Sequence, residues 1–566
     1  MSWTRCVAAL VVGLGVSVIQ AESGPPAAPF DGHTFQQPVD GYGVYDDGSC
    51  MPARTIAVFG GSRELEPVWT VATAAPVLTP TRLADVTGDG IDEIIVTTYY
   101  PDPNNPYQGG VVHVLNLDGQ YLLGWPKEVL PGPFAGGAAV ADLDGDGDGE
   151  IVAGNWYKAF VWNHDGTNYP GWPKNYGTYD VPTLADLDND DDYEIIYSRT
   201  NKTLYVWHHD GTSFSGWPYV APDSVNSPCV ADLDGDGEME LAAGTSQGPV
   251  GSEPFEVYVW EADGTVKTGF PVDTSGVVKA ALALGDIDAD GEIEIVACAF
   301  HISNNDYIHV WEADGSVAAG WPRQATYARL SAPALGDLDG DGDLEIVVGG
   351  MKPAPFDEML FAFHHDGSTV DGWPVELHNP SGSSNPNSSP LICDIDGDPA
   401  QVEVLLKVND HLYALHGDGT LVDGFPYYFS DAGHTGTYSP TPAVGDPDAD
   451  GQVELVYVTN NGTIAYFELE TPFDPTQAYW RQFKHDACGT GYYPAAPELC
   501  AGDLNCDGAV DFDDIDPFVA ALGCQGGDPN CWDPACPWLN GDCDDDGTVD
   551  FDDIDPFVAR IGATCP

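Results

Sequence analysis

The chain has 566 residues, with 90 Asp and Glu against 18 Lys and Arg, and a formal net charge of −72. This acidic excess argues against a nucleic-acid partner and against a polybasic attachment to anionic lipid, because both need clusters of Lys and Arg. Disorder is not implied, since 43% of the residues are hydrophobic, and the 66 Gly and 46 Pro favour turns and short strands over long helices.

The first 21 residues are typical of a secretory signal peptide. Arg5 supplies the positive charge, residues 6–19 form an apolar run, and Ala21 is a small residue before the expected cleavage site. The run is too short to cross a membrane comfortably. We therefore expect a secreted, extracellular or cell-surface-associated protein with no membrane span in the mature chain, opening on a Gly- and Pro-rich lead-in over residues 22–50.

Residues 51–485 repeat one unit of about fifty residues, a period typical of propellers and solenoids. Each unit predicts a strand entering an acidic loop, a strand leaving it, an alternating strand that ends at an Asp-Gly turn, and a strand that opens with Gly-Trp-Pro or Gly-Phe-Pro. Four-stranded units in radial array form an all-β propeller, and eight acidic loops predict eight blades. Residues 56–72 resemble a lone outer hairpin and residues 463–484 a complete final one, so seven blades remain an alternative. Because the Gly-Trp-Pro aromatics recur in every unit, we expect them to pack between blades rather than to stack on sugars.

The loops follow the pattern D-x-D-x-D-G-x-x-E, which converges carboxylates on one point. Such clustering is repulsive unless a hard cation neutralises it, and calcium suits six to eight flexible oxygen ligands. The first loop has Thr87 in place of the second Asp, the third has Asp191 where glycine is expected, and the seventh carries Pro399 and delays Glu403 by one residue. The predicted ligands are Asp85, Asp89 and Glu93; Asp142, Asp144, Asp146 and Glu150; Asp186, Asp188, Asp190 and Glu194; Asp232, Asp234, Asp236 and Glu240; Asp286, Asp288, Asp290 and Glu294; Asp337, Asp339, Asp341 and Glu345; Asp394, Asp396 and Asp398; and Asp446, Asp448, Asp450 and Glu454.

These repeats resemble the FG-GAP or VCBS-type repeats of the integrin α-subunit propeller and of many secreted bacterial proteins, over roughly residues 55–485. The resemblance implies a calcium-binding propeller in which each calcium loop joins the first two strands of a blade. The calcium loops and the Asp-Gly turns then share one face. Connections of variable length occupy the other face, which we expect to bind a polysaccharide or protein ligand. These connections are residues 101–110, 244–255, 351–358 and 378–389.

After an expected linker at residues 486–499, residues 500–566 contain two further acidic loops with EF-hand-like spacing, each followed by the sequence IDPFVA. Their predicted ligands are Asp503, Asn505, Asp507, Asp511 and Asp514, and Asp542, Asp544, Asp546, Asp550 and Asp553. The pair is similar to a type I dockerin, a small α-helical module that docks onto a cohesin, which implies a cohesin-like partner. A plain calcium-stabilised module or a thrombospondin-like acidic repeat are the alternatives. Together with the propeller loops, these sites predict calcium as the cofactor, with up to about ten ions.

Of the 13 cysteines, seven lie in the last 67 residues, which predicts disulfides in an exported chain. Cys488 is either an eighth member of that group or the partner of Cys50. Cys229, Cys298 and Cys393 fall in predicted strands and are expected to be buried free thiols.

The sequence offers little evidence of catalytic residues. Residues 244–248 fit G-x-S-x-G, but in a repeat connector rather than at a strand-to-helix elbow, and the pairs His208–His209 and His364–His365 are interpreted as turn residues. We therefore expect a non-catalytic binding or adhesion protein, displayed through its dockerin-like module. The alternative is an extracellular polysaccharide lyase or glycoside hydrolase of propeller fold.

Overall fold

The structure, a computed structural model, divides the chain into two compact units, Met1–Tyr493 and Pro494–Pro566. It describes residues 39–44, 50–56 and 65–493, apart from gaps at 74, 103–104, 133, 179, 191, 200–201, 246–254, 275, 301–304, 327–330, 352–357, 378–387, 399–400, 410 and 429–439. The expected signal peptide and the whole second unit, with both dockerin-like loops, lie outside the described residues.

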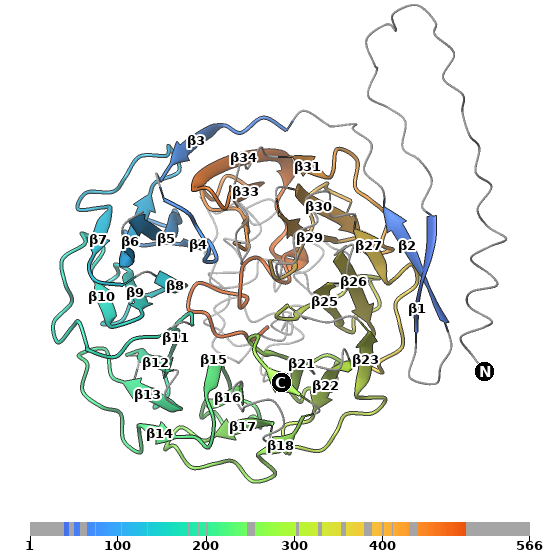
Figure 1. Ribbon diagram of the computed structural model, residues 1–566, viewed down its shortest axis with the longest axis horizontal. Helices are drawn as coiled ribbons and strands as arrows, with labels where there is room; N and C mark the ends of the chain where they lie inside the picture. Colours follow the sequence, from blue (N-terminus) through green and yellow to red (C-terminus); the bar gives the residue numbers. More distant parts are fainter. Residues whose placement is uncertain are drawn as a thin grey trace, which may run out of the picture. The chain divides into compact units, whose positions relative to one another are not determined.

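The first unit is an eight-bladed β-propeller, in which the sheets are arranged around a central axis (Figure 1). Blades 1–4 comprise β4 (Arg82–Ala84), β5 (Glu93–Asp102), β6 (Asn105–Leu115) and β7 (Lys127–Val129); β8 (Phe134–Ala141), β9 (Glu150–Asn155) and β10 (Ala159–Trp162); β11 (Thr183–Ala185), β12 (Glu194–Arg199), β13 (Thr203–Trp207) and β14 (Tyr219–Val220); and β15 (Val225–Ala231), β16 (Glu240–Thr245), β17 (Glu256–Trp260) and β18 (Val272–Asp273).

Blades 5–8 continue the ring. They comprise β19 (Val277–Val278), β20 (Ala283–Gly285), β21 (Glu294–Phe300), β22 (Asn305–Trp311) and β23 (Arg323–Thr326); β24 (Ala334–Gly336), β25 (Glu345–Met351), β26 (Glu358–Phe363) and β27 (Val375–Leu377); β28 (Leu391–Cys393), β29 (Glu403–Val408), β30 (His411–His416) and β31 (Tyr427–Tyr428); and β32 (Ala443–Gly445), β33 (Gln452–Val458), β34 (Thr463–Pro472) and β3 (Trp69–Ala72). Within blades the pairing is antiparallel, and the short first strands are almost completely buried because they face the centre of the ring.

A strand from the N-terminal side of the repeats closes the ring. β3 pairs with β34 as the outermost strand of blade 8, so one blade is built from both ends of the repeat region. The two hairpins expected at residues 56–72 and 463–484 therefore contribute one blade strand each among the described residues, which decides between the seven- and eight-bladed alternatives in favour of eight. Part of the expected lead-in is ordered as well, because β1 (Val39–Val44) and β2 (Cys50–Ile56) form a hairpin that pairs in parallel with β27.

The recurring Gly-Trp-Pro tryptophans connect neighbouring blades, as predicted. The buried indole of Trp125 donates its N–H to the carbonyl oxygen of His164 in the Asp-Gly turn of the next blade, at 2.8 Å. A Cβ on Gly124 would lie 1.9 Å from the carbonyl oxygen of Asp165, so only glycine permits this approach. Equivalent indole bonds of 2.7–2.8 Å are made by Trp172, Trp217, Trp321 and Trp373.

Residues 477–493, which we call the channel segment, run through the middle of the ring after the short 3-10 helix η1 (Pro475–Gln477) (Figure 1). Carbonyl oxygens of this segment accept backbone hydrogen bonds of 2.9–3.0 Å from the first strands of six blades; the donors are Val140, Leu184, Val230, Leu284, Ile392 and Val444. The side chain of Gln482 exchanges hydrogen bonds with the backbone of Leu83 in blade 1, and Tyr479 packs against Gly336 in blade 6. The segment therefore contacts every blade, and residues 486–493, expected to be linker, belong to the propeller.

The described cysteines of the propeller support the prediction of free thiols. Cys229, Cys298 and Cys393 are buried and free. Cys488 is also free, with its sulfur 3.5 Å from the carbonyl oxygen of Val140, although the sequence predicted it to be paired. In the part of the chain that the structure describes, no helix has the length and apolar character needed to cross a membrane.

Candidate metal centres

Each acidic loop joins the first and second strands of its blade, and its first aspartate holds the turn together. In blade 2, the carboxylate of Asp142 accepts the backbone N–H groups of Asp146 and Gly147 at 3.1 and 2.9 Å. Gly147 has φ 95°, in the left-handed region that glycine tolerates. The same bonds to the first aspartate recur in the loops that begin at Asp85, Asp232, Asp286, Asp337 and Asp446.

The glutamate that ends each loop is almost completely buried, and in seven blades it is the first residue of the second strand. In seven blades its Oε2 accepts the backbone N–H of the second loop residue, at 2.7–3.1 Å. The seventh loop keeps this contact although its glutamate is delayed, since Glu403 accepts the N–H of Ile395 at 2.9 Å. Glu403 therefore takes the same place as the other glutamates, although the sequence pattern did not assign it as a ligand.

Blade 8 is the exception, because its second loop residue is Pro447, which has no N–H to donate. Both carboxylate oxygens of Glu454 are buried without a hydrogen-bond partner, and the residue is 1% exposed. Burial, followed by the carboxylates of Asp448, Asp446 and Asp450, raises the pKa of Glu454 to about 9. An unpaired buried carboxylate of this kind costs several kcal/mol unless a cation neutralises it, roughly 1–3 kcal/mol for the unmade hydrogen bond alone.

The other loop glutamates show the same electrostatic strain. Burial is the largest cause in each case. It raises the pKa of Glu294 to about 9, that of Glu150 to about 8, and those of Glu93, Glu194, Glu240, Glu345 and Glu403 to about 7. Because neighbouring carboxylates raise several of these values further, the loops are acidic clusters without enough internal positive charge.

The structure brings two or three acidic residues of a loop together in blades 2, 3, 4, 6 and 7, and the third aspartate of the pattern is in none of these sets. In blades 2, 3 and 4 the first aspartate, the second aspartate and the glutamate offer oxygens that all lie within 4.8 Å of one another; the sets are Asp142, Asp144 and Glu150, Asp186, Asp188 and Glu194, and Asp232, Asp234 and Glu240. In blades 6 and 7 the second aspartate and the glutamate are joined by a histidine instead, in the sets Asp339, Glu345 and His364, and Asp396, Glu403 and His416.

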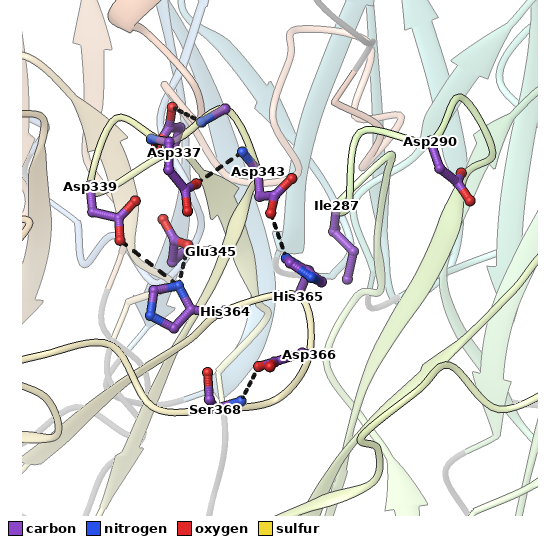
Figure 2. A network of polar contacts seen from close by, with 12 residues as sticks. Ile287, Asp290, Asp337, Asp339, Asp343, Glu345, His364, His365, Asp366 and Ser368 are labelled. Carbon is purple, nitrogen blue, oxygen red and sulfur yellow. Dashed lines mark hydrogen bonds and ion pairs between the residues drawn. The ribbon is translucent and has the colours of Figure 1, made fainter.

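These histidines lie at the end of the third strand, directly over the loop. Figure 2 shows blade 6, where the His364 ring lies between Asp339 and Glu345, and the next residue, His365, points to Asp343. His364 Nδ1 lies 2.9 Å from Glu345 Oε1, and His416 Nδ1 lies 2.9 Å from Glu403 Oε1. In blade 3, His208 makes the same contact with Glu194 at 3.0 Å. His208 and His364 were interpreted as turn residues, and the structure instead places both against loop glutamates.

Blade 4 carries a cation of its own. Lys267, 7% exposed, places its Nζ 2.6 Å from Asp234 Oδ2, 3.2 Å from Glu240 Oε1 and 3.5 Å from Glu261 Oε2. Burial opposes its charge, but the carboxylates outweigh burial and raise the pKa of Lys267. No loop pattern identifies Lys267, because it lies beyond the Asp-Gly turn, at a position occupied by Phe214 in blade 3 and Ala318 in blade 5.

The remaining sequence predictions fall partly or wholly outside the described residues. The connections at residues 244–255, 351–358 and 378–389 are described only at their ends, and residues 101–110 lie mainly in β5 and β6. Of the G-x-S-x-G match, Gly244 and Thr245 end β16 and the other three residues are not described. The candidate ligands in the second unit, Asp503, Asn505, Asp507, Asp511, Asp514, Asp542, Asp544, Asp546, Asp550 and Asp553, are outside the described part of the chain.

Comparison with known structures supports the fold. The V. cholerae biofilm matrix protein Bap1 superimposes with a TM-score of 0.51 at 16% identity, covering 75% of this chain and 95% of that chain. The Dos1 propeller gives a TM-score of 0.48 at 10% identity over 73% of this chain and 96% of that chain. A quinohemoprotein alcohol dehydrogenase from Comamonas testosteroni gives 0.46 at 11% identity over 72% and 77%. At these identities the likeness concerns the fold alone.

Comparison with curated protein sequences gives no match. The family model described as FG-GAP-like repeat matches residues 85–153, 186–243 and 286–348. These segments begin at the first aspartates of the loops in blades 1, 3 and 5, and each extends into the second strand of a later blade. The chain therefore contains FG-GAP-like repeats, arranged as an eight-bladed propeller.

Proposed function

We propose that this chain is a secreted, calcium-stabilised propeller that acts as a non-catalytic binding protein, attached to a partner through its C-terminal module. Glu454 is the observation that carries the calcium part of this proposal. Its carboxylate is buried with neither oxygen hydrogen-bonded, and it lies among the acidic side chains of its own loop. A cation bound there would supply the missing partner for both oxygens.

The donor set fits calcium. Except where histidine or lysine intervenes, the clustered donors are carboxylate oxygens, which hard cations prefer. Calcium binds oxygen at about 2.3–2.6 Å, so two of its ligands are at most about 5 Å apart. The oxygens of Asp142, Asp144 and Glu150 meet this limit, because all three lie within 4.8 Å of one another.

Ions in these loops would also strengthen contacts between blades. The loops of adjacent blades are joined by backbone hydrogen bonds: Gly149 N to Val86 O at 2.9 Å, and Leu344 N to Ile287 O at 3.0 Å. In the blade that closes the ring, Asp92 N donates to Pro447 O at 2.7 Å. A bound ion that fixes one of these loops would therefore help to fix the loop that is hydrogen-bonded to it in the adjacent blade.

Repetition favours a structural role for these carboxylates over a catalytic one. A catalytic centre acts at one place in a chain, whereas a stabilising ion gains by being repeated in several blades. The proposed ligand-binding surface is the opposite face, where the connections vary in length, and the proposed ligand is a polysaccharide or a protein. Attachment to a cohesin-like partner rests on the spacing of the C-terminal loops, and polysaccharide lyase or hydrolase activity is the competing proposal.

Thermal unfolding of the full chain with calcium and with a chelator tests the calcium proposal. An ion at a hundred times its dissociation constant adds about 2.7 kcal/mol per site, so chelation should lower the Tm markedly. Without a bound ion, folding forces Glu454 to take up a proton, because burial raises its pKa to about 9. The variant Glu454→Gln removes this cost and one candidate ligand, so it should raise the Tm of the chelated protein and reduce the gain from calcium. Glu128→Gln, at an exposed position in β7, is the matched control and should change neither value. An unchanged Tm on chelation would refute the proposal.

The binding role is tested separately with a panel of acidic polysaccharides. Binding without release of reducing sugar or of unsaturated products is the expected result. Turnover of any member would replace the binding proposal with the enzymatic one. A pull-down of cohesin-like proteins by the full chain should succeed with calcium and fail with chelator.

A further inference from the structure

The eight loops are not chemically equivalent, because the residue at the end of the third strand differs between blades. Asn116 and Asn163 occupy it in blades 1 and 2, Glu261 and Glu312 in blades 4 and 5, and His208, His364 and His416 in blades 3, 6 and 7. In blades 6 and 7 the histidine nitrogen also lies within 4.0 Å of the second aspartate of the loop. Since asparagine or glutamate also serves there, the turn itself does not require an imidazole. What the imidazole adds is a nitrogen donor directed at the buried glutamate.

We propose that the Asp–Glu–His sets of blades 6 and 7 bind a divalent transition metal of the zinc class in preference to calcium. The inference rests on the proposed function only in holding that the acidic loops take divalent cations. Calcium is bound by oxygen ligands, whereas an imidazole together with carboxylates suits zinc and its first-row neighbours.

The distances from each histidine nitrogen to its two carboxylates fit a small metal ion. Zinc binds nitrogen and oxygen at about 2.0–2.2 Å, so two of its ligands are at most about 4.3 Å apart. In blade 6, His364 Nδ1 lies 2.9 Å from Glu345 Oε1 and 4.0 Å from Asp339 Oδ2. In blade 7, the corresponding distances from His416 Nδ1 are 2.9 Å to Glu403 and 3.8 Å to Asp396.

The buried glutamate is held in position for such a role. In blade 6, Glu345 Oε2 is fixed by the backbone N–H of Leu338 at 2.7 Å, which leaves Oε1 as the oxygen directed at the imidazole. Glu345 and Glu403 have fully buried side chains, while His364 and His416 are 25% and 23% exposed. Each set therefore combines one rigid carboxylate with two donors that solvent, and hence a metal ion, can reach (Figure 2 for blade 6).

Blade 7 also offers space for a further ligand. A cavity of about 380 Å³ is lined by Asp396 and His416 together with apolar side chains that include Leu421, Val422 and Phe425. Three protein donors leave one position of a tetrahedral zinc ion open. In blade 7 that position would lie at the wall of a cavity large enough to admit a water molecule as the fourth ligand.

Cobalt(II) titration of the full, chelator-stripped chain in saturating calcium tests the inference, because visible absorption distinguishes four-coordinate from six-coordinate cobalt. We expect an intense four-coordinate spectrum that added zinc suppresses. His364→Gln and His416→Gln should each reduce the bound four-coordinate cobalt by one equivalent. His164→Gln is the control, since His164 is 40% exposed and pairs with Asp148 outside the predicted ligand set. Circular dichroism of each variant in calcium establishes that it is folded.

Two results would overturn the inference. One is a weak, six-coordinate spectrum that the double variant His364→Gln/His416→Gln leaves unchanged, and the other is the absence of cobalt binding. Neither bears on the calcium-dependent Tm, which is measured on the same samples. A different result would separate the two proposals. If calcium did not change the Tm but cobalt binding still depended on the histidines, the proposed calcium function would be refuted and the transition-metal sites would be retained.

Discussion

Replacing Lys267 with methionine should create a calcium site in blade 4. The ammonium group of Lys267 contacts Asp234 and Glu240, two of the carboxylates that would otherwise bind the ion, at 2.6 and 3.2 Å. Glu261 adds a third carboxylate at 3.5 Å. Lys267 therefore already neutralises this loop, and we expect the wild-type loop to take no calcium.

The size of the effect follows from these distances. An ion bonded to both Asp234 and Glu240 at about 2.4 Å would lie roughly 4 Å from the Lys267 nitrogen. Two unit charges at 4 Å interact by about 4 kcal/mol at an effective dielectric constant of 20, so a divalent ion and the ammonium repel by about 8 kcal/mol. Since 1.4 kcal/mol is a factor of ten in affinity, repulsion of this size excludes the ion unless the lysine leaves the loop.

Calorimetric calcium titration of the full chain measures the number of sites. Lys267→Met should bind one equivalent more than the wild type. Lys127→Met is the matched control and should bind the same number, because Lys127 lies over the ring of Trp125 at 5.8 Å rather than in a loop. Without calcium, Lys267→Met should be destabilised by about 3–5 kcal/mol, since it leaves the buried Glu240 unpaired, and calcium should restore the loss. An unchanged number of equivalents, with the variant folded, would refute this reasoning.

Two further predictions concern stability. Trp480→Ala truncates a channel-segment side chain that is 1% exposed, so it should lower the free energy of unfolding in urea by about 3–5 kcal/mol. The control Leu123→Ala, at a position that is 91% exposed, should lower it by less than about 0.5 kcal/mol. Equal losses would show that residues 477–493 do not support the ring. Burial lowers the pKa of both His113 and His309 to about 4, so the folded state resists their protonation and stability should fall as the pH drops from about 6.5 towards 4. The double variant His113→Gln/His309→Gln should lose less stability than the wild type between pH 7 and pH 4.5, and an identical loss would contradict the assignment.

The blades and loops could be predicted because their determinants are local and repeated. Each loop carries its aspartates, turn and buried glutamate within nine residues, as in Asp142 to Glu150, so one unit suffices to recognise it. Glu403 lies one residue later than the repeat pattern predicts, but its side chain still accepts the backbone N–H of Ile395, as the other loop glutamates do with their second loop residues. Local spacing thus located the acidic loops, but it did not assign a residue such as Glu403 that departs from the repeated pattern.

The channel segment could not be predicted in the same way, because it has no repeat and little regular structure. Many of its partners, such as Val140 and Ile392, lie far away in sequence and contact it through backbone atoms, which leave no trace in side-chain patterns. Lys267 and His416 were missed for a related reason. Their role depends on the third strand and its turn folding back over the loop, which the spacing of the loop residues does not encode.

Three of the few basic residues of this very acidic chain are buried inside the propeller. Arg82, Lys407 and Lys484 are each no more than 1% exposed, although the chain has only 18 Lys and Arg. They donate to backbone carbonyl oxygens: Arg82 to Ala138 at 2.9 Å, Lys484 to Pro228 at 2.6 Å and Lys407 to Val458 at 2.6 Å. Burial lowers the pKa of Lys484 to about 8 and that of Arg82 to about 10, because removing these charged groups from water costs free energy.

This distribution supports the proposal that the loops bind external cations. Arg82 and Lys484 are occupied at the channel segment, where Arg82 also donates to Asp486 O at 2.8 Å and Lys484 to Thr183 Oγ1 at 2.7 Å. Among the eight loops of the described propeller, only that of blade 4 contains a lysine from its own blade, Lys267. The remaining acidic loops have carboxylates in excess, and we propose that bound metal ions neutralise them. The channel segment and the loop ions would then stabilise the same ring, one from its centre and the other from its rim.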